Sequence, residues 1–391
     1  MGTTELAVIG GGIGGLTAAL AMAQRGLAVA VYEQARGLAE IGAGLHVSPN
    51  GVKVLHALGL EDDLARVAGR PRSIVTRHYA TGTPNFESAF DSAFDARFGA
   101  PFLSLHRADL LAILANAVAN EPRVQLMLGS RAVRVDEDHA GTNVVFEDGG
   151  RTSAAAVVAA DGVHSRIRAN MHGGITTKFT GHVAYRGMAA TAELPVGLVE
   201  PKFNIWVGPG RHFVAYPVRR GELINYVALV EEEGWTEESW TTKADKSNLA
   251  AAFEGWHETV RALVGHTLRG ECYKWALLGR DPLPYWSTGR VTLLGDAAHP
   301  MVPYLAQGAV MAIEDAWVLA ASLASSSDTA AAFGTCERAR LERTAAVQTA
   351  AWQQGQLNHS VGRGDQGDRF QGGGFSDPGW IYGHDVVAAF L

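Results

Sequence analysis

Three glycines near the start of the chain have the spacing of a loop that binds a dinucleotide. Gly10, Gly12 and Gly15 lie between a short apolar run and an Ala- and Leu-rich stretch, residues 6–9 and 16–24. In such a loop the first glycine permits a tight turn, the second lets a pyrophosphate approach the backbone, and the third lets a helix pack on a strand. The helix then directs its free amides and the positive end of its dipole at the phosphates.

An acidic residue follows at the position where a ribose would lie. The apolar run 28–32 ends at Glu33, whose carboxylate can accept a hydrogen bond from a ribose hydroxyl, and Gln34 stands beside it. Strand, loop, helix, strand and terminal acid agree with one βαβ unit. We therefore interpret the glycines as a nucleotide site and not as an incidental turn.

Two further polar motifs follow apolar runs later in the chain. Asp296 ends a predicted buried strand and can accept a hydrogen bond from a ribitol hydroxyl, or serve only as a helix cap. A predicted helix begins at Gly308 and Ala309, and its N-terminus points at whatever lies past the motif. The positive end of the helix dipole would stabilise the edge of a ring that gains negative charge on reduction. Asp161 ends another apolar run, and taken alone it is typical of a capped helix start.

In this order the three motifs resemble those of the class A flavoprotein aromatic hydroxylases, over nearly the whole chain. The resemblance implies FAD as cofactor, with the glycine loop on its ADP part, Asp296 on its ribityl chain, and Asp161 serving both FAD and the pyridine nucleotide. It also assigns Arg107 to the FAD pyrophosphate and gives Ala132 a backbone contact to adenine. The implied reductant is NADH, and NADPH stays open because this family has no second nucleotide domain.

Within the family, four segments are similar to the 6-hydroxynicotinate 3-monooxygenases: residues 41–50, 211–216, 303–308 and 377–383. This implies hydroxylation of a hydroxylated aromatic or pyridine carboxylic acid with NADH and O₂, with loss of CO₂. Ala298 stands where those enzymes have Cys, and residues 182–276 match loosely. Salicylate 1-hydroxylase and 3-hydroxybenzoate 6-hydroxylase activities therefore stay open, as does a flavin reductase or dehydrogenase that does not use O₂.

Two histidines and a tyrosine are the candidate catalytic groups, with His46 as the first candidate for the base near the hydroxyl and His212 as the candidate donor near the carboxylate. His46 follows a Gly-Ala-Gly turn, where backbone can approach a flat ring, and a histidine can take a phenolic or hydroxypyridine proton. The alternative is that His46 packs under FAD as a structural contact. His212 and Tyr216 are four apart on a predicted strand, so both face one pocket. The resemblance makes them substrate ligands together with Pro303, with Tyr216 as a second candidate base.

The motifs predict an α/β fold in which a Rossmann-like FAD-binding domain carries an inserted antiparallel β-sheet substrate domain. After Gly355 the composition turns to Gly, Asp and Gln, which predicts a loop. The expected FAD-binding domain comprises residues 1–75, 101–181 and 277–350. The expected substrate domain comprises residues 76–100 and 182–276, and residues 351–391 form a C-terminal segment.

Composition limits the partners of the chain. With 391 residues, a net charge of -7 and 47% hydrophobic residues, it has a sizeable core and no basic surface for nucleic acid. The uncharged stretch near the N-terminus is rich in glycine, and no basic run suggests a membrane. The two cysteines lie in no paired motif, which favours core thiols, no bound metal and a cytoplasmic location. We expect a small aromatic acid and O₂ as partners, and a monomer or homodimer.

Overall fold

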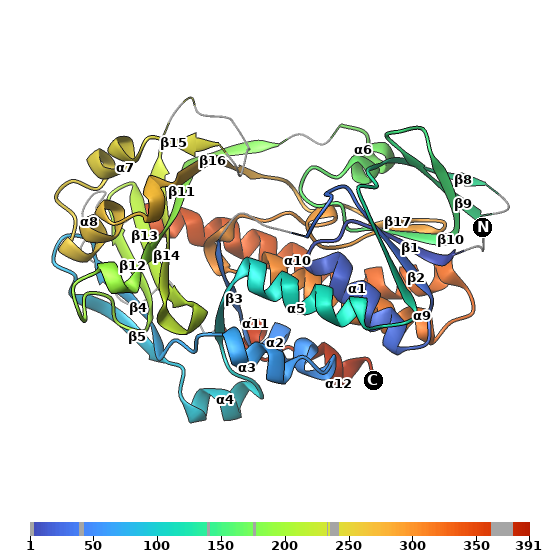
Figure 1. Ribbon diagram of the computed structural model, residues 1–391, viewed down its shortest axis with the longest axis horizontal. Coiled ribbons are helices and arrows are strands. Elements are labelled where there is room, and N and C mark those ends of the chain that lie inside the picture. Colours follow the sequence, from blue (N-terminus) through green and yellow to red (C-terminus); the bar gives the residue numbers. More distant parts are fainter. Residues whose placement is uncertain are drawn as a thin grey trace.

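The computed structural model describes residues 4–38, 43–138, 141–174, 177–232, 234, 242–360 and 378–391. Two eight-stranded sheets occupy opposite ends of the molecule, and the long helix α10 (Thr329–Ser360) runs between them (Figure 1). Within the described residues no helix is both long and apolar enough to cross a bilayer. Cys272 and Cys336 are free and buried, as the sequence predicted.

The first sheet positions the nucleotide motifs. Its strands follow the order β17-β18-β10-β1-β2-β7, with β9 attached to β10 and β8 to β9. The pairs β10–β18, β1–β10, β1–β2 and β2–β7 are parallel, so their carboxyl ends lie at one edge. The central strands are apolar because both of their faces are buried. The strands are β1 (Thr4–Ile9), β2 (Val29–Glu33), β7 (Val124–Leu128), β8 (Ala132–Asp138), β9 (Gly141–Phe146), β10 (Arg151–Ala159), β17 (Ser287–Thr288) and β18 (Val291–Leu293).

Helices cover the first sheet and carry the motif residues at their ends. On one face the large apolar core joins α1 (Ile13–Gln24), α5 (Arg107–Ala119) and α9 (Gly308–Ala324) to the strands. The remaining helices of four or more residues in this half are α2 (Pro49–Ala57), α3 (Glu61–Val67), α6 (Arg166–His172) and α12 (Val386–Ala389).

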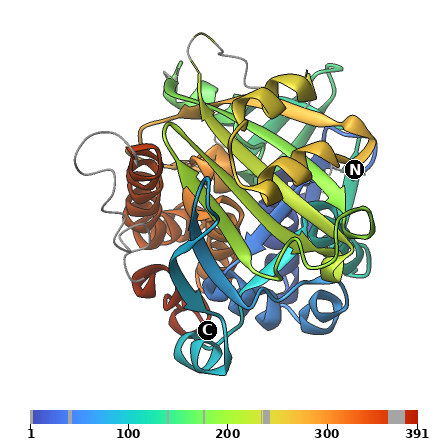
Figure 2. The same ribbon diagram turned by 90° about the vertical axis from the view of Figure 1, so that its left-hand side faces the viewer.

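The second sheet has one covered face and one face directed at the nucleotide half. Helices α7 (Lys246–Ala252) and α8 (Glu258–Gly265) lie across its outer face (Figure 2). In β11, Val183 and Tyr185 pack against the cluster of these helices, so the alternate residues Ala184 and Arg186 face inward. The order β15-β16-β11-β14-β13-β12-β4-β5 comprises β4 (Ser73–His78), β5 (Pro84–Ala89), β11 (Lys178–Ala190), β12 (Phe203–Gly208), β13 (Arg211–Val218), β14 (Leu223–Glu231), β15 (Lys243–Ala244) and β16 (Cys272–Gly279).

Short elements close the space between the sheets. The two-stranded sheet of β3 (Gly44–Val47) and β6 (Leu103–His106) is antiparallel and carries His46 opposite Ser104. The turns η4 (Gly295–Ala297) and η5 (Pro303–Leu305) lead into α9. Helices α4 (Ser92–Phe98) and α11 (Gly379–Tyr382) flank the second sheet near β4 and β5.

A buried ion cluster joins α9, α10 and α11. Arg340 contacts Glu314 at 2.6 Å, and both side chains are almost fully excluded from solvent. Arg343 also binds Glu314, at 2.8 Å, and donates to the backbone carbonyl of Ile381 at 3.1 Å. Because the charges are paired, their burial is tolerated, and the cluster fixes α11 so that Tyr382 lines the cavity described below.

The predicted α/β architecture is confirmed, with two local differences. The loop was expected to begin after Gly355, and this start is wrong because α10 continues to Ser360; the rest of that stretch, residues 361–377, lies outside the described residues. A Cβ atom at Gly355 would lie 2.4 Å from the ring of Tyr304, so this glycine serves close packing and not a helix end. In addition, β12 pairs with β4 in parallel within the otherwise antiparallel second sheet.

The division into domains stays a prediction, since three strands cross the expected limits. Strand β4 begins before residue 76, β11 before residue 182, and β16 ends after residue 276. Residues 361–377, which belong to the expected C-terminal segment, lie outside the described residues.

Candidate active site

The glycine loop has the geometry that its spacing predicts. It connects β1 to α1, and Gly10 has a φ of +106°, a conformation that favours glycine. A Cβ atom at Gly10 would lie 2.3 Å from the carbonyl oxygen of Ala160, and one at Gly15 would lie 2.0 Å from that of Gly10. At Gly12 a Cβ atom would meet no described atom within 4 Å. Gly12 therefore borders open space at the N-terminus of α1, which fits a pyrophosphate.

Glu33 is held in place at the end of β2. Its two carboxylate oxygens accept hydrogen bonds from the backbone amides of Gly11, at 2.6 Å, and Ala35, at 2.7 Å. A carboxylate has about four acceptor positions, so capacity remains for a ribose hydroxyl. Gln34 is exposed beside it, and Ala132 begins β8 and packs against the apolar cluster that includes β2.

Asp161 caps α6 and also keeps one oxygen for a ligand. Its Oδ2 accepts from the backbone amides of Arg166, at 2.9 Å, and Ile167, at 3.3 Å. Its Oδ1 is buried without a hydrogen-bond partner among the described residues, and burial raises the pKa of this carboxyl group. A buried acceptor without a donor is costly, so Oδ1 fits a hydroxyl or amide of a bound ligand. Arg168 of the same motif donates to the backbone carbonyl of Asp296 at 3.0 Å and joins the two motifs.

A cavity of about 270 Å³ lies between the nucleotide motifs and the second sheet. Asp296 and Arg107 line it, and Asp296 is exposed within the single turn η4. Gly308 and Ala309 form the first turn of α9, so free backbone amides face the cavity. Pro303 lines it as well. Together with the open glycine loop and the unpartnered oxygen of Asp161, these groups fit FAD.

The inner face of the second sheet forms the opposite wall. His212 and Tyr216 of β13 are buried and line the same cavity, with Val214 between them, as the four-residue spacing predicted. Burial raises the pKa of the Tyr216 hydroxyl well above its usual value, and the Arg186 charge opposes this only in part. Near neutral pH Tyr216 therefore keeps its proton and donates hydrogen bonds.

His46 lies at the Tyr216 end of the cavity. Its ring is packed against Phe203 and Tyr216, with centroid distances of 4.1 and 3.9 Å. Nδ1 is 3.0 Å from the hydroxyl of Ser104, and Nε2 is buried without a hydrogen-bond partner among the described residues. Burial lowers the pKa of His46 to about 3. His46 is therefore neutral at physiological pH and offers one ring nitrogen to a ligand.

Arg186 is a cavity residue that the sequence analysis did not single out. It is 6% exposed, and its guanidinium lies over the ring of Trp275, 5.4 Å from the centroid. The strand register places Arg186 in one row with Val227 and Val214, so it stands level with the midpoint between His212 and Tyr216. Arg186 alternates with buried apolar residues along β11, and this pattern is the signal that could have identified it. The pattern alone does not show that Arg186 faces a cavity, because that also depends on the register of the neighbouring strands.

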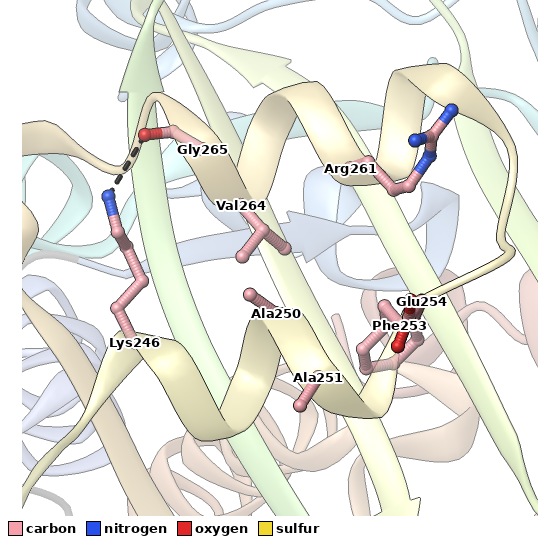
Figure 3. A pocket seen from close by; sticks show the side chains of 8 residues that line it. All are labelled: Lys246, Ala250, Ala251, Phe253, Glu254, Arg261, Val264 and Gly265. Atoms are coloured by element: carbon pink, nitrogen blue, oxygen red, sulfur yellow. Dashed lines mark hydrogen bonds between the residues drawn. The ribbon is translucent and has the colours of Figure 1, made fainter.

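A second hollow lies far from the nucleotide motifs, between α7 and α8 on the outer face of the second sheet (Figure 3). It measures about 360 Å³, and Lys246 bridges one end of it by donating to the backbone carbonyl of Gly265 at 3.0 Å. Ala250, Ala251 and Val264 line it. Its charged lining residues, Lys246, Glu254 and Arg261, lie on the outer face of the sheet, away from the nucleotide motifs. The cavity near Asp296 is therefore the candidate active site.

Comparison with known proteins agrees with this geometry. Residues 3–353 match the model of a family described as FAD binding domain. The chain belongs to the class A flavoprotein aromatic hydroxylases. The hydroxylase is 38% identical to 3-amino-4-hydroxybenzoate 2-monooxygenase PtmB3 of Streptomyces platensis, over 98% of this chain and 96% of that one. It is 37% identical to 6-hydroxynicotinate 3-monooxygenase of Bordetella bronchiseptica, over 99% and 97% of the two chains.

Solved structures place the hydroxylase in the same family. It is similar to Klebsiella pneumoniae HpxO complexed with FAD and uric acid, with a TM-score of 0.82 and 30% identity over 93% of this chain and 90% of that one. FAD as cofactor and monooxygenase activity are thereby confirmed. The alternative of a flavin enzyme that does not use O₂ is not supported. The roles expected for single residues are not decided by these similarities and stay predictions.

Proposed function

We propose that the hydroxylase acts on a small aromatic or pyridine ring that carries both a hydroxyl and a carboxylate group, with NADH as reductant. Bound FAD supplies the oxygen chemistry, in which one atom of O₂ enters the ring and the other leaves as water. The chain binds the ring, excludes water and moves the hydroxyl proton. Two named relatives act on rings of this kind, 3-amino-4-hydroxybenzoate and 6-hydroxynicotinate.

The observation that supports this proposal is the buried cation of Arg186 in the cavity wall. A guanidinium stays charged at physiological pH and presents planar N–H donors that match the geometry of a carboxylate. The rest of the inner face near Arg186 is apolar, with Val214, Val227 and Trp275. A flat ring fits such a wall, and a carboxylate on the ring would pair with the guanidinium.

Two imidazoles at opposite ends of the cavity are available to the ring hydroxyl. His46 lies beside Tyr216, whereas His212 lies four residues away along the same strand, about 13 Å in an extended chain. Removing the hydroxyl proton raises the electron density at the ortho and para carbons. The proposed base is one of these histidines, and Tyr216 donates a hydrogen bond to the substrate.

Decarboxylation depends on which carbon is attacked. In 6-hydroxynicotinate the carboxylate-bearing carbon is para to the hydroxyl, and attack there releases CO₂. We propose this outcome because the segments around Tyr216, Pro303 and Tyr382 are similar to those of the 6-hydroxynicotinate enzymes. A relative that acts on 3-amino-4-hydroxybenzoate at carbon 2 makes retention of the carboxylate the second candidate.

The proposal is tested with the purified, FAD-loaded protein in air. NADH oxidation is measured with 6-hydroxynicotinate, salicylate, 3-hydroxybenzoate and 3-amino-4-hydroxybenzoate, and with phenol and 2-hydroxypyridine as matched rings without a carboxylate. We expect stimulation coupled to a hydroxylated product only with the acids, and mass spectrometry then reports whether CO₂ is lost. Equal coupling with phenol would contradict the requirement for an acid, and no coupled product from any acid would overturn the proposal.

A further inference from the structure

A cluster of titratable side chains lies directly behind the cavity wall. His212, which lines the cavity, has its Nδ1 2.9 Å from Nε2 of His359 at the end of α10. Tyr304, which also lines the cavity, has its hydroxyl 2.7 Å from Nδ1 of His182 in β11. Two cavity residues thus each contact an imidazole in a second layer.

Both second-layer imidazoles converge on one carboxylate. Nδ1 of His359 is 3.9 Å from Oε1 of Glu231, and Nε2 of His182 is 3.8 Å from the same oxygen. The register places Glu231 opposite His182 and two residues beyond Leu229, the strand partner of His212. The two histidine side chains are buried, whereas the Glu231 side chain is 31% exposed. Glu231 therefore connects the cluster to solvent.

We propose that Glu231 is the exit of a proton relay that starts at His212 in the cavity and passes through His359, with Tyr304 and His182 as a parallel branch. The proposal rests on the proposed function, since it concerns the proton of the substrate hydroxyl. Each step exchanges one proton. Nε2 of His212 takes the hydroxyl proton while its Nδ1–H passes to Nε2 of His359. The Nδ1–H of His359 then passes to Glu231, and from there the proton enters solvent.

The cluster needs such an exit because a charged His212 cannot persist. Burial, followed by the charges that His359 and His182 carry when protonated, lowers the pKa of His212 well below its usual value. A proton accepted at His212 must therefore leave as it arrives. The distances to Glu231 exceed a hydrogen bond and are closed by a small side-chain rotation or one bridging water.

The same residue types could suggest a metal site, but the ring orientation disfavours one. The rings of His182 and His359 are stacked, with centroids 3.8 Å apart and an interplanar angle of 23°. A zinc ion about 2 Å from both nitrogens would have to lie in both ring planes, and stacked planes at this angle do not meet within that reach. Proton transfer between neighbours requires no such convergence.

The test compares two neighbouring substitutions that remove the same charge. Glu231→Gln blocks the exit, whereas Glu232→Gln changes the next residue, which faces the other side of the sheet and binds Lys274. Substrate is mixed with the FAD-loaded enzyme without NADH in weak buffer, and a pH indicator follows release of the hydroxyl proton. We expect release to be at least about tenfold slower in Glu231→Gln and to be restored by added imidazole buffer, with the dissociation constant of the substrate unchanged. Glu232→Gln should stay within about twofold of the wild type.

Further variants keep the inference falsifiable. His359→Gln retains a hydrogen-bond partner for His212 but cannot pass a proton on, so it should also slow release. Unchanged release in both Glu231→Gln and His359→Gln would overturn the relay. Loss of release after treatment of the wild type with EDTA would replace it by a metal site. If the wild type hydroxylates no aromatic acid, the proposed function fails instead, and this outcome is separate from failure of the relay.

Discussion

The two halves of the hydroxylase specify their ligands by different means. In the nucleotide half, much of the ligand site is backbone: a left-handed glycine at position 10, open space at Gly12 and the first turn of α9. In the second sheet, the site is made of side chains that alternate along strands, such as Arg186 and His212. Backbone sites depend on local conformation, which a short motif encodes, whereas the side-chain wall depends on strand register between distant segments.

The largest expected effect tests the backbone half at two glycines of one loop. Gly12→Val should fold but lose FAD, because its side chain enters the space left for the pyrophosphate, where it meets no described atom of the chain. Gly15→Val should fail to fold normally, because its Cβ atom would lie 2.0 Å from a backbone oxygen. FAD absorbance and circular dichroism of both variants separate the two effects. A yellow Gly12→Val protein would contradict the assignment of this loop.

The next effect concerns the two histidines of the side-chain wall. His212→Gln should lower kcat by about 10²–10⁴-fold, which is typical of removing a general base, with FAD content intact. The loss should shrink at high pH, where the substrate ionises unaided. His46→Gln serves as the matched variant and should have the smaller effect on kcat. If His46→Gln shows the large loss and His212→Gln does not, His46 is the base.

Arg186→Met should weaken the recognition of acids more than the chemistry. Loss of a charged hydrogen bond costs about 1.5–3 kcal/mol, which corresponds to a rise in KM of roughly 10–150-fold. Arg186→Lys keeps the charge and should retain part of the affinity. Steady-state kinetics with an acid and with its analogue that lacks the carboxylate check this difference. An equal rise in KM for both rings would mean that Arg186 only supports the wall.

The smallest effect is a pH dependence of stability at His46. Its pKa is about 3 in the folded state and about 6.5 when unfolded. The unfolded chain therefore binds more protons between these values, and stability falls as the pH drops below 6.5, by up to about 1.4 kcal/mol per unit. His46→Gln removes this contribution, so its stability relative to the wild type should improve by about 2 kcal/mol between pH 6.5 and 5. Denaturant unfolding at both pH values measures it, and a constant difference would contradict the buried neutral state.

The comparison also explains what the sequence could predict. The glycine loop, Asp161 and Asp296 were recognisable because each follows an apolar strand within a few residues. Arg186 was missed because its alternation with apolar neighbours shows only which residues share one face of the strand. It does not show whether that face lines a cavity. His359 was missed because it is 147 residues from His212 and lies in a stretch expected to be a loop. Its helix continues because Gly355 lets the ring of Tyr304 pack closely.

The parallel pairing of β1, β10 and β18 has a consequence for how the chain reaches its native state. Adjacent strands in this sheet come from residues 4–9, 151–159 and 291–293, so their contacts close loops of more than a hundred residues. Such long-range pairing is entropically costly to nucleate and slows folding. The pairing of β1, β10 and β18 should therefore form late in folding. Before this pairing forms, partly folded chains would expose the apolar strands of the sheet. FAD binding to the completed loop would then shift the equilibrium toward the native state.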